Sequence, residues 1–297
     1  MTRLGHLSTE GARAERAEID RLPTGELVRL MNADDAIVPA AVGEAGPAIA
    51  AAVDAIVERL EAGGRLIYVG AGTAGRVGVL DASECGPTFN TDRVVGVIAG
   101  GQVAVSTASE SAEDHPDSGA QAIALLGVGA DDAVVGISAS GRTPYVLGAI
   151  ERARASGALT VGLACNEGSD LSAAADLAIE VLVGPEFIAG STRLKAGTAQ
   201  KLVLNMLSTL TMVRLGKTYG NLMVDVRVTN AKLRDRATRI VEQVAGVTHA
   251  TAAAALAEAD DDAKVAIAML RTGTTPDAAR ERLAAADGHL RRALMET

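Results

Sequence analysis

The chain is poor in aromatic residues. Phe, Trp and Tyr make up 2% of its 297 residues, and Trp is absent. Because 48% of the chain is nevertheless hydrophobic, the core must be built mainly from Ala, Val, Leu and Ile. Together with 32 glycines, this is typical of an α/β protein with close helix packing and small-residue turns. The length allows one large domain or two smaller ones.

Cysteine and histidine are also scarce. The two cysteines, Cys85 and Cys165, are too few for a disulfide framework. We expect buried thiols in a reduced, cytoplasmic protein. The four histidines are scattered and show no spacing typical of a metal site. The sequence therefore predicts a protein without a bound metal.

Basic clusters and long apolar runs are missing as well. The formal net charge is −9, and a nucleic-acid-binding surface would need clustered Lys and Arg. The longest uncharged run, Val94 to Ser109, has 16 residues and contains polar side chains, whereas a membrane span needs about 20 mainly apolar residues. The N-terminus lacks the apolar core of a signal peptide. We expect no nucleic acid and no membrane as partners.

Short apolar runs alternate with helical patterns through the middle of the chain. They are rich in β-branched residues and do not alternate with polar ones, as expected of strands buried on both faces. Strands separated by helices indicate right-handed crossovers and a parallel sheet. The sequence predicts an α/β fold with a doubly wound, five-stranded parallel sheet. The predicted strands are Arg65–Gly70, Val94–Ala99, Ala133–Ile137, Leu159–Ala164 and Leu177–Val183.

Helical patterns flank this region on both sides. The early ones cover Glu26–Asn32 and Ala48–Glu61, and Gly63-Gly64 ends the second. A long helix is predicted over Thr192–Gly216, and an Ala-rich helical bundle beyond Thr229 includes a helix start at Thr275-Pro276. The predicted divisions are an N-terminal helical segment (1–55), a sheet domain (56–220) and a C-terminal helical domain (221–297).

Two loops follow predicted strands at the sheet edge where ligands bind in such folds. The first, GAGTAGR at 70–76, matches G-x-G-x-x-G, which alone is a weak signal. A dinucleotide site would need an acidic residue at the end of the second strand, and that strand ends in AGGQ at 99–102. The pattern therefore argues against dinucleotide binding.

The second loop, SASGRTP at 138–144, favours a monophosphate. Thr143 is a predicted N-cap, and Pro144 suits the first helical position. Ser138 and Ser140 add hydroxyls beside a helix N-terminus, whose amides and dipole favour an anion. The alternative is an ordinary capped turn without a ligand.

Both loops resemble the two halves of a SIS (sugar isomerase) phosphosugar-binding domain. Further segments resemble the N-acetylmuramic acid 6-phosphate etherases: LDASECGPTF at 80–89, VIAGG at 97–101, ESAED at 110–114, TRLKAGTAQKLVLNMLST at 192–209 and YGNLMVDV at 219–226. The resemblance covers nearly the whole chain. It implies a SIS-type fold and a cytoplasmic carbon–oxygen lyase of cell-wall amino-sugar recycling, which forms N-acetylglucosamine 6-phosphate and D-lactate. It also implies a homodimer without a cofactor.

The same resemblance implies the site residues. Glu84 matches one catalytic glutamate of the family and is assigned as general acid, and Glu113 matches the other and is assigned as base, although the roles could be exchanged. Ala74 stands where the family commonly has serine, and the loss of that hydroxyl is expected to weaken phosphate affinity. The expected substrate-binding residues are Gly72, Thr73, Gly75, Arg76, Ser138, Ser140, Gly141, Arg142, Thr143 and Lys195.

Competing interpretations remain open from the residues alone. Glu113 lies among other acids, so a solvated acidic surface is an alternative, and Lys195 could be a surface charge. A non-catalytic phosphosugar-sensing regulator would not need Glu84 and Glu113 together. A phosphosugar isomerase would share proton abstraction at C2 of the sugar but would not explain the etherase segments.

Overall fold

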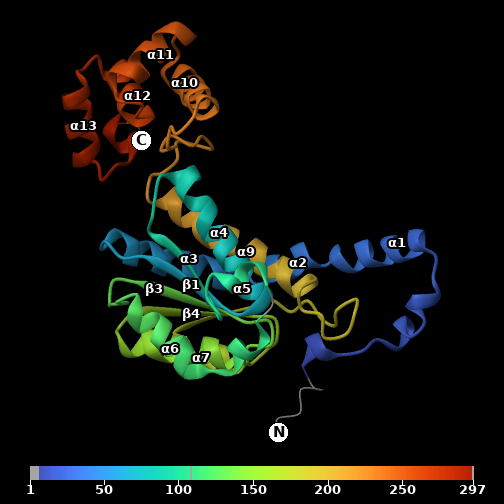
Figure 1. The fold of residues 1–297 in the computed structure, drawn as a ribbon. Coiled ribbons are helices and arrows are strands. Elements are labelled where there is room, and N and C mark those ends of the chain that lie inside the picture. The colour runs from blue at the N-terminus through green and yellow to red at the C-terminus, as the bar shows by residue number, and fades with distance from the viewer. Residues whose placement is uncertain (1–6, 108, 296–297) are drawn as a thin grey trace. The chain divides into compact units, whose positions relative to one another are not determined.

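The computed structural model describes residues 7–107 and 109–295 (Figure 1). The chain forms two compact units. The first contains Met1–Ser83 and Arg93–Ser208, and the second contains Glu84–Asp92 and Thr209–Thr297. The three-part division at residues 55 and 220 stays a sequence-based prediction.

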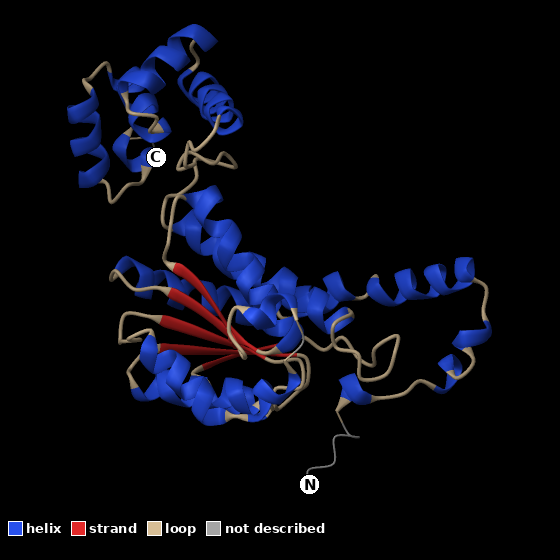
Figure 2. Cartoon of the chain, in the orientation of Figure 1, coloured by secondary structure: helices blue, strands red, loops and turns tan. Residues whose placement is uncertain are grey.

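The first unit is built on a five-stranded sheet in which every pair of neighbours is parallel (Figure 2). The strand order is β2-β1-β3-β4-β5, so the chain reverses its direction of winding after β2. This confirms the predicted doubly wound sheet. The strands are β1 (Leu66–Gly70), β2 (Val94–Ile98), β3 (Ala133–Ile137), β4 (Leu159–Ala164) and β5 (Leu177–Glu180).

Helices cover both faces of this sheet, which explains why its strands do not alternate with polar residues. Every residue of β1, β3 and β4 is buried. On one face Ile67 and Val69 belong to a core with residues of α6 and α7. On the other face the Tyr68 hydroxyl donates to the Leu204 carbonyl of α9 over 3.3 Å. A Cβ atom on Gly78 of α4 would lie 3.1 Å from the Tyr68 Cβ, so a small residue permits this close helix–sheet packing.

The helices of the first unit follow the predicted order, with further short ones between the strands (Figure 1). The predicted helices at Glu26–Asn32 and Ala48–Glu61 lie within α1 and α3, and the predicted Thr192 start moves to Lys195. The bounds are η2 (Ser8–Glu10), η3 (Ala14–Arg16), η4 (Ile19–Arg21), α1 (Thr24–Asp35), α2 (Val38–Glu44), α3 (Gly46–Glu61), α4 (Gly72–Phe89), α5 (Val103–Ser106), η5 (Glu110–Asp114), α6 (Pro116–Leu125), α7 (Pro144–Ala155), α8 (Asp170–Ala174) and α9 (Lys195–Arg214). Both α4 and α9 continue into the second unit.

The second unit contains an Ala-rich helical bundle, as predicted. Its core consists largely of alanines with a few larger residues, and α12 is buried along most of its length. Side-chain caps start four helices: Asn230, Thr248, Asp262 and Thr275 each accept from a backbone amide three residues on. The helices are α10 (Ala231–Ala245), α11 (His249–Glu258), α12 (Ala263–Thr272), α13 (Pro276–Ala285) and α14 (Leu290–Ala293).

Both cysteines are free and buried, as expected. Burial, with a smaller contribution from the charge of Glu186, raises the pKa of Cys165 to about 12, so the protonated thiol is favoured at neutral pH. Within the described ranges, no single helix is long and apolar enough to cross a membrane. One bent pair, Thr24–Glu44 with Gly46–Glu61 at 58°, passes on length and composition alone.

Candidate functional site

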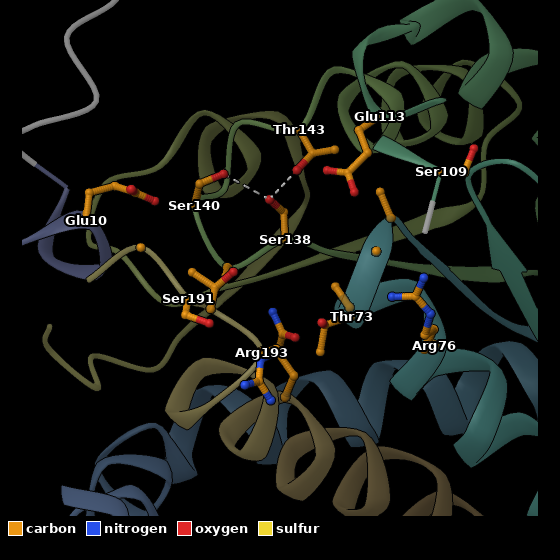
Figure 3. A pocket seen from close by; sticks show the side chains of 17 residues that line it. Glu10, Thr73, Arg76, Ser109, Glu113, Ser138, Ser140, Thr143, Ser191 and Arg193 are labelled. Carbon is orange, nitrogen blue, oxygen red and sulfur yellow. Dashed lines mark hydrogen bonds between the residues drawn. The ribbon is translucent and has the colours of Figure 1, made fainter. Parts of the chain in front are cut away.

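A cavity of about 380 Å³ lies at the carboxyl ends of β1 and β3, where a parallel sheet is expected to bind its ligand (Figure 3). Its volume falls in the range of small-molecule sites. Both predicted loops contribute to its wall, together with η5 and the segment before α9. The lining residues are Glu10, Ala71, Gly72, Thr73, Ala74, Arg76, Ser109, Glu113, Ser138, Ala139, Ser140, Thr143, Gly190, Ser191, Thr192, Arg193 and Gln200.

The glycines of the first loop allow β1 to turn sharply into α4. A Cβ atom on Gly70 would lie 2.7 Å from the Gly75 amide nitrogen, so the strand end and the first turn of the helix approach too closely for a side chain. Gly72 has a φ of +53°, in the left-handed region that favours glycine. The turn thus brings the first turn of α4, with Thr73 and Ala74, to the cavity wall. Gly75 itself serves packing and does not line the cavity.

Arg76 connects this turn to the segment after β2. Its Nε donates to the Val105 carbonyl over 3.2 Å, and its Nη2 donates to the Thr107 carbonyl over 3.3 Å. The residue lines the cavity as predicted. Its guanidinium therefore places a positive charge at the wall and also holds the chain that leads towards Ser109.

The second loop forms a connected set of hydroxyl groups. Ser138 Oγ lies 2.8 Å from Thr143 Oγ1 and 3.3 Å from Ser140 Oγ, and it accepts a 3.1 Å hydrogen bond from the Gly141 amide. Ser140 Oγ accepts from the Arg142 amide over 3.2 Å. Figure 3 shows the three hydroxyl side chains together at the cavity. The loop thus presents several hydroxyl groups beside the N-terminus of α7.

The structure differs from the prediction in one detail of the N-cap at Thr143. This residue occupies the N-cap position of α7 with Pro144 following, but its side chain makes no capping hydrogen bond. Because Thr143 Oγ1 is paired with Ser138 Oγ, it is turned away from the helix amides. Pro144 has no N–H, and the Val146 and Leu147 amides donate to the Thr143 carbonyl over 3.0 and 3.1 Å. The features of this loop that favour an anion are therefore its hydroxyl groups and the positive end of the α7 dipole.

The side chain of Glu113, in η5, lies close to Gly72 of the first loop. It lines the cavity, and its Oε1 would lie only 2.8 Å from a Cβ atom on Gly72. The absence of a side chain at Gly72 is therefore what allows this carboxylate to rest against the start of α4. The acidic segment after β2 is not merely a solvated surface, because this carboxylate faces the predicted binding site (Figure 3).

The structure does not bring every predicted residue to the cavity. Gly141 has a φ of +69° and packs against Ser169, which a Cβ would approach to 2.3 Å. The Arg142 Nε lies 3.9 Å from Asp170 Oδ2. Glu84 is exposed on α4, twelve residues after Gly72 along the helix, and does not line the cavity.

Lys195 differs most from its predicted surroundings. It is fully buried, its Nζ donates to the Val183 carbonyl over 2.7 Å, and it does not line the cavity. Burial, followed by the charge of Arg13, lowers the pKa of its ammonium, and nearby carboxylates offset this in part. The predicted substrate contact of Lys195 finds no support in this geometry, and the alternative of a surface charge is wrong.

One wall of the cavity was not predicted from the sequence. The segment before α9 contributes Ser191, Thr192 and Arg193, and α9 itself contributes Gln200. Glu10 reaches the cavity from η2, where its Oε2 would lie 3.0 Å from a Cβ on Gly190. Apart from the segments that carry the resemblance, nothing in the local pattern marks these residues, because they reach the cavity through the fold.

The cavity combines both signs of charge. Arg76 and Arg193 provide guanidinium groups, while Glu10 and Glu113 provide carboxylates. The described part of the chain contains no group of three or more His, Cys, Asp or Glu residues placed to hold a metal ion. The available chemistry is therefore anion binding by hydroxyls, amides and guanidinium groups, together with proton transfer by carboxylates.

Comparison with protein families gives three matches along the chain. Residues 48–154 match the glucokinase regulatory protein N-terminal SIS domain, 106–210 match the SIS domain, and 220–271 match the C-terminal lid domain of glucokinase regulatory protein. A solved phosphoheptose isomerase from Francisella tularensis shares the fold. It matches with a TM-score of 0.51 and 22% identity over 65% of this chain and 100% of that chain.

Curated relatives match at much higher identity. A protein of Rubrobacter xylanophilus named N-acetylmuramic acid 6-phosphate etherase is 65% identical over 99% of this chain and 98% of its own length. A protein of the same name from Streptomyces avermitilis is 61% identical over 97% of this chain and 93% of its own length. These matches extend over both units.

Proposed function

The chain belongs to the family of N-acetylmuramic acid 6-phosphate etherases, and from this membership we propose that it cleaves the lactyl ether of N-acetylmuramic acid 6-phosphate. The products are N-acetylglucosamine 6-phosphate and D-lactate. The similarity of this chain to its relatives along nearly its whole length is the observation that carries the proposal. We place the reaction in the cytoplasm, in the recycling of cell-wall amino sugars.

The second loop, residues 138–144, is the proposed site of the phosphate and is called the hydroxyl loop below. Ser138, Ser140 and Thr143 already contact one another at the cavity, and α7 begins directly after them. A phosphate has several acceptor oxygens and a negative charge, which match hydroxyl donors and the positive end of a helix dipole. This end of the cavity therefore fixes C6 of the sugar.

An ether is a poor leaving group, so the reaction needs activation of the sugar. In the open-chain form, the aldehyde at C1 makes the hydrogen on C2 acidic. A base removes that proton, the electron pair forms a double bond between C2 and C3, and the C3–O bond breaks. The departing oxygen takes a proton from an acid and leaves as lactate. Water then adds at C3, and a proton returns to C2.

Glu113 is the proposed base at C2. Its carboxylate lines the cavity and lies against Gly72, between the first loop and η5. A carboxylate positioned at the reacting carbon can accept the proton and later return it. The proposed base is therefore a group that already lines the cavity.

Glu84 is the proposed acid at the lactyl oxygen, in a homodimer. It is exposed on α4, four residues after the exposed Leu80, so the two share one face of the helix. Along α9, Met206, Leu210 and Val213 are 38%, 43% and 42% exposed and follow one another on one face. Such apolar faces fit association with a second copy, in whose cavity Glu84 would act.

The test is turnover of N-acetylmuramic acid 6-phosphate in heavy water enriched in oxygen-18. The expected products are lactate without the heavy oxygen at its former ether position, and a sugar that carries deuterium at C2 and oxygen-18 at C3. Binding of the phosphosugar without lactate release or exchange would indicate a sensor instead. Exchange at C2 without lactate release would indicate an isomerase-like site.

A further inference from the structure

Gln200 has a buried amide group with an unused donor. The residue is 1% exposed, it lines the cavity, and its Nε2 has no hydrogen-bond partner among the residues that the structure describes. Buried amide groups in folded proteins are nearly always hydrogen-bonded, because leaving one unpaired destabilises the fold. A donor left unpaired at a cavity wall therefore points to a ligand that accepts from it.

The fold explains how Gln200 comes to this wall. A Cβ atom on Gly197 would lie 3.1 Å from Thr73 Cγ2, so the first turn of α9 packs against the first turn of α4. Gln200 follows Gly197 by three residues and therefore lies on the same face of α9. Its side chain thus reaches the cavity beside Thr73.

Arg193 provides a positive charge on the same wall. It is exposed, it lines the cavity, and it has no ion-pair partner within residues 7–107 and 109–295. Figure 3 shows Arg193 and Thr73 on one side of the cavity and Ser140 and Thr143 on the other. The wall that contains Arg193 and Gln200 and the hydroxyl loop are therefore two separate groups of hydrogen-bond donors.

We propose that Gln200, together with Arg193, binds the lactyl carboxylate of the substrate. The inference rests on the proposed function, which gives the substrate two anionic groups, a phosphate on C6 and a carboxylate on the C3 substituent. With the phosphate at the hydroxyl loop, the opposite wall faces the C3 end of the sugar. A carboxylate only accepts hydrogen bonds at neutral pH, and an amide NH₂ and a guanidinium are matching donors.

This subsite distinguishes substrate from product. N-acetylglucosamine 6-phosphate has the phosphate and the N-acetyl group but lacks the lactyl carboxylate. Removal of the Gln200 amide should therefore weaken binding of the substrate and leave binding of the product nearly unchanged. The product thus serves as a probe for every contact except the one proposed.

The experiment compares wild type with Gln200→Met, a linear apolar side chain of similar length, and with Gln121→Met on the exposed surface of α6 as control. We expect kcat/KM for N-acetylmuramic acid 6-phosphate to fall about 10-fold or more in Gln200→Met, as for a lost hydrogen bond to a charged group. The inhibition constant of N-acetylglucosamine 6-phosphate should change less than about 2-fold in the same variant. The control should match wild type in both.

Thermal unfolding without ligand separates binding from folding defects. Since Gln200→Met removes an unpaired polar group, its unfolding temperature should equal or exceed that of wild type. An equal loss of affinity for substrate and product would overturn the lactyl assignment, as would unchanged kinetics. Absence of lactate release by wild type would instead reject the proposed function, so the two failures are distinguishable.

Discussion

Oε1 of Glu113 would lie 2.8 Å from a Cβ atom at position 72, where the chain has glycine. The carboxylate is the flexible end of its side chain, so Gly72→Ala should displace it instead of blocking folding. A displacement of about 1 Å at a reacting group can lower the rate about 100-fold. We expect lactate release by Gly72→Ala to fall at least about 10-fold, measured as kcat at saturating substrate.

The strain of alanine at positive φ needs its own control. Gly127 has a φ of +59°, close to the +53° of Gly72, and a Cβ there would meet no atom within 4 Å. Gly72→Ala and Gly127→Ala should therefore both lower the free energy of unfolding by roughly 1–2 kcal/mol, measured by thermal unfolding. An equal loss of kcat in Gly127→Ala would contradict a specific effect on Glu113.

Glu113→Gln keeps the shape of the side chain and removes the base. The rate of lactate release should fall by about 10²- to 10⁴-fold, the usual contribution of a positioned base. Deuterium exchange at C2 should be lost to a similar extent, whereas the inhibition constant of N-acetylglucosamine 6-phosphate should stay close to that of wild type. Asp117→Asn, an exposed acid at the start of α6, is the matched control. Exchange that persists in Glu113→Gln while lactate release is lost would assign Glu113 to a step after proton abstraction.

The sheet and its loops could be predicted because their causes are local. Buried strands require apolar residues on both faces, and the run at Ala133–Ile137 meets that requirement without any knowledge of its neighbours. The turn after β1 requires glycine where β1 and α4 approach, which the spacing of Gly70 and Gly75 shows directly. Such features can be read from a few adjacent residues.

The rest of the site depends on contacts between distant segments. The α9 helix begins at Lys195 because the Glu186 carboxylate accepts from the amides of Lys195 and Ala196, over 2.9 and 3.0 Å. No local helix pattern contains this cap, which comes from nine residues upstream. Glu10 reaches the cavity beside Gly190 for the same kind of reason. Their contributions follow from tertiary structure and could not be predicted from spacing.

A substitution at Ala74 is expected to strengthen phosphate binding. Ala74 lies in the first turn of α4, lines the cavity and stands where serine is common in the family. The first loop and the loop at 138–144 follow the neighbouring strands β1 and β3 and line one cavity, so a phosphate held at 138–144 can also accept from a hydroxyl at position 74. Such a hydrogen bond to a charged group adds roughly 1.5–3 kcal/mol, which is about 10-fold or more in affinity. Ala74→Ser should therefore lower the inhibition constant of N-acetylglucosamine 6-phosphate by about that factor. Ala82→Ser, on the same helix outside the cavity, should have no effect. An unchanged constant in Ala74→Ser would place the phosphate away from this turn.

Asp132 and Arg65 form an ion pair at the opposite ends of β1 and β3 from the cavity. Asp132 Oδ2 lies 2.8 Å from Arg65 Nη2, and its carboxylate also accepts from the Arg65 and Gly129 amides. Burial alone would raise the pKa of Asp132, but these hydrogen bonds and the Arg65 charge together hold it below its ordinary value.

The ionised form of Asp132 is therefore the stabilising one. Its contribution is complete above the ordinary aspartate pKa of about 4 and is lost as the pH falls through the lower pKa of the folded state. Asp132→Asn should cost about 1–3 kcal/mol at pH 7, measured by denaturant unfolding, and this difference should shrink on acidification. The exposed Asp277, paired with Arg280, is the control position, and Asp277→Asn should change stability little. A difference between wild type and Asp132→Asn that stays constant down to pH 2 would reject this account.

Glu84 and Glu113 can be assigned to one copy of the chain or to two by mixing inactive variants. Glu84→Gln and Glu113→Gln should each lose most lactate release. If Glu84 acts in the cavity of a second copy, a mixed dimer contains one site with both glutamates and one site with neither. Random mixing after subunit exchange makes about half of the dimers mixed, so activity should recover to about one quarter of wild type. Mixing either variant with itself is the control. Absence of recovery after confirmed exchange would place both carboxylates in one chain, because a mixed dimer would then hold two sites that each lack one glutamate.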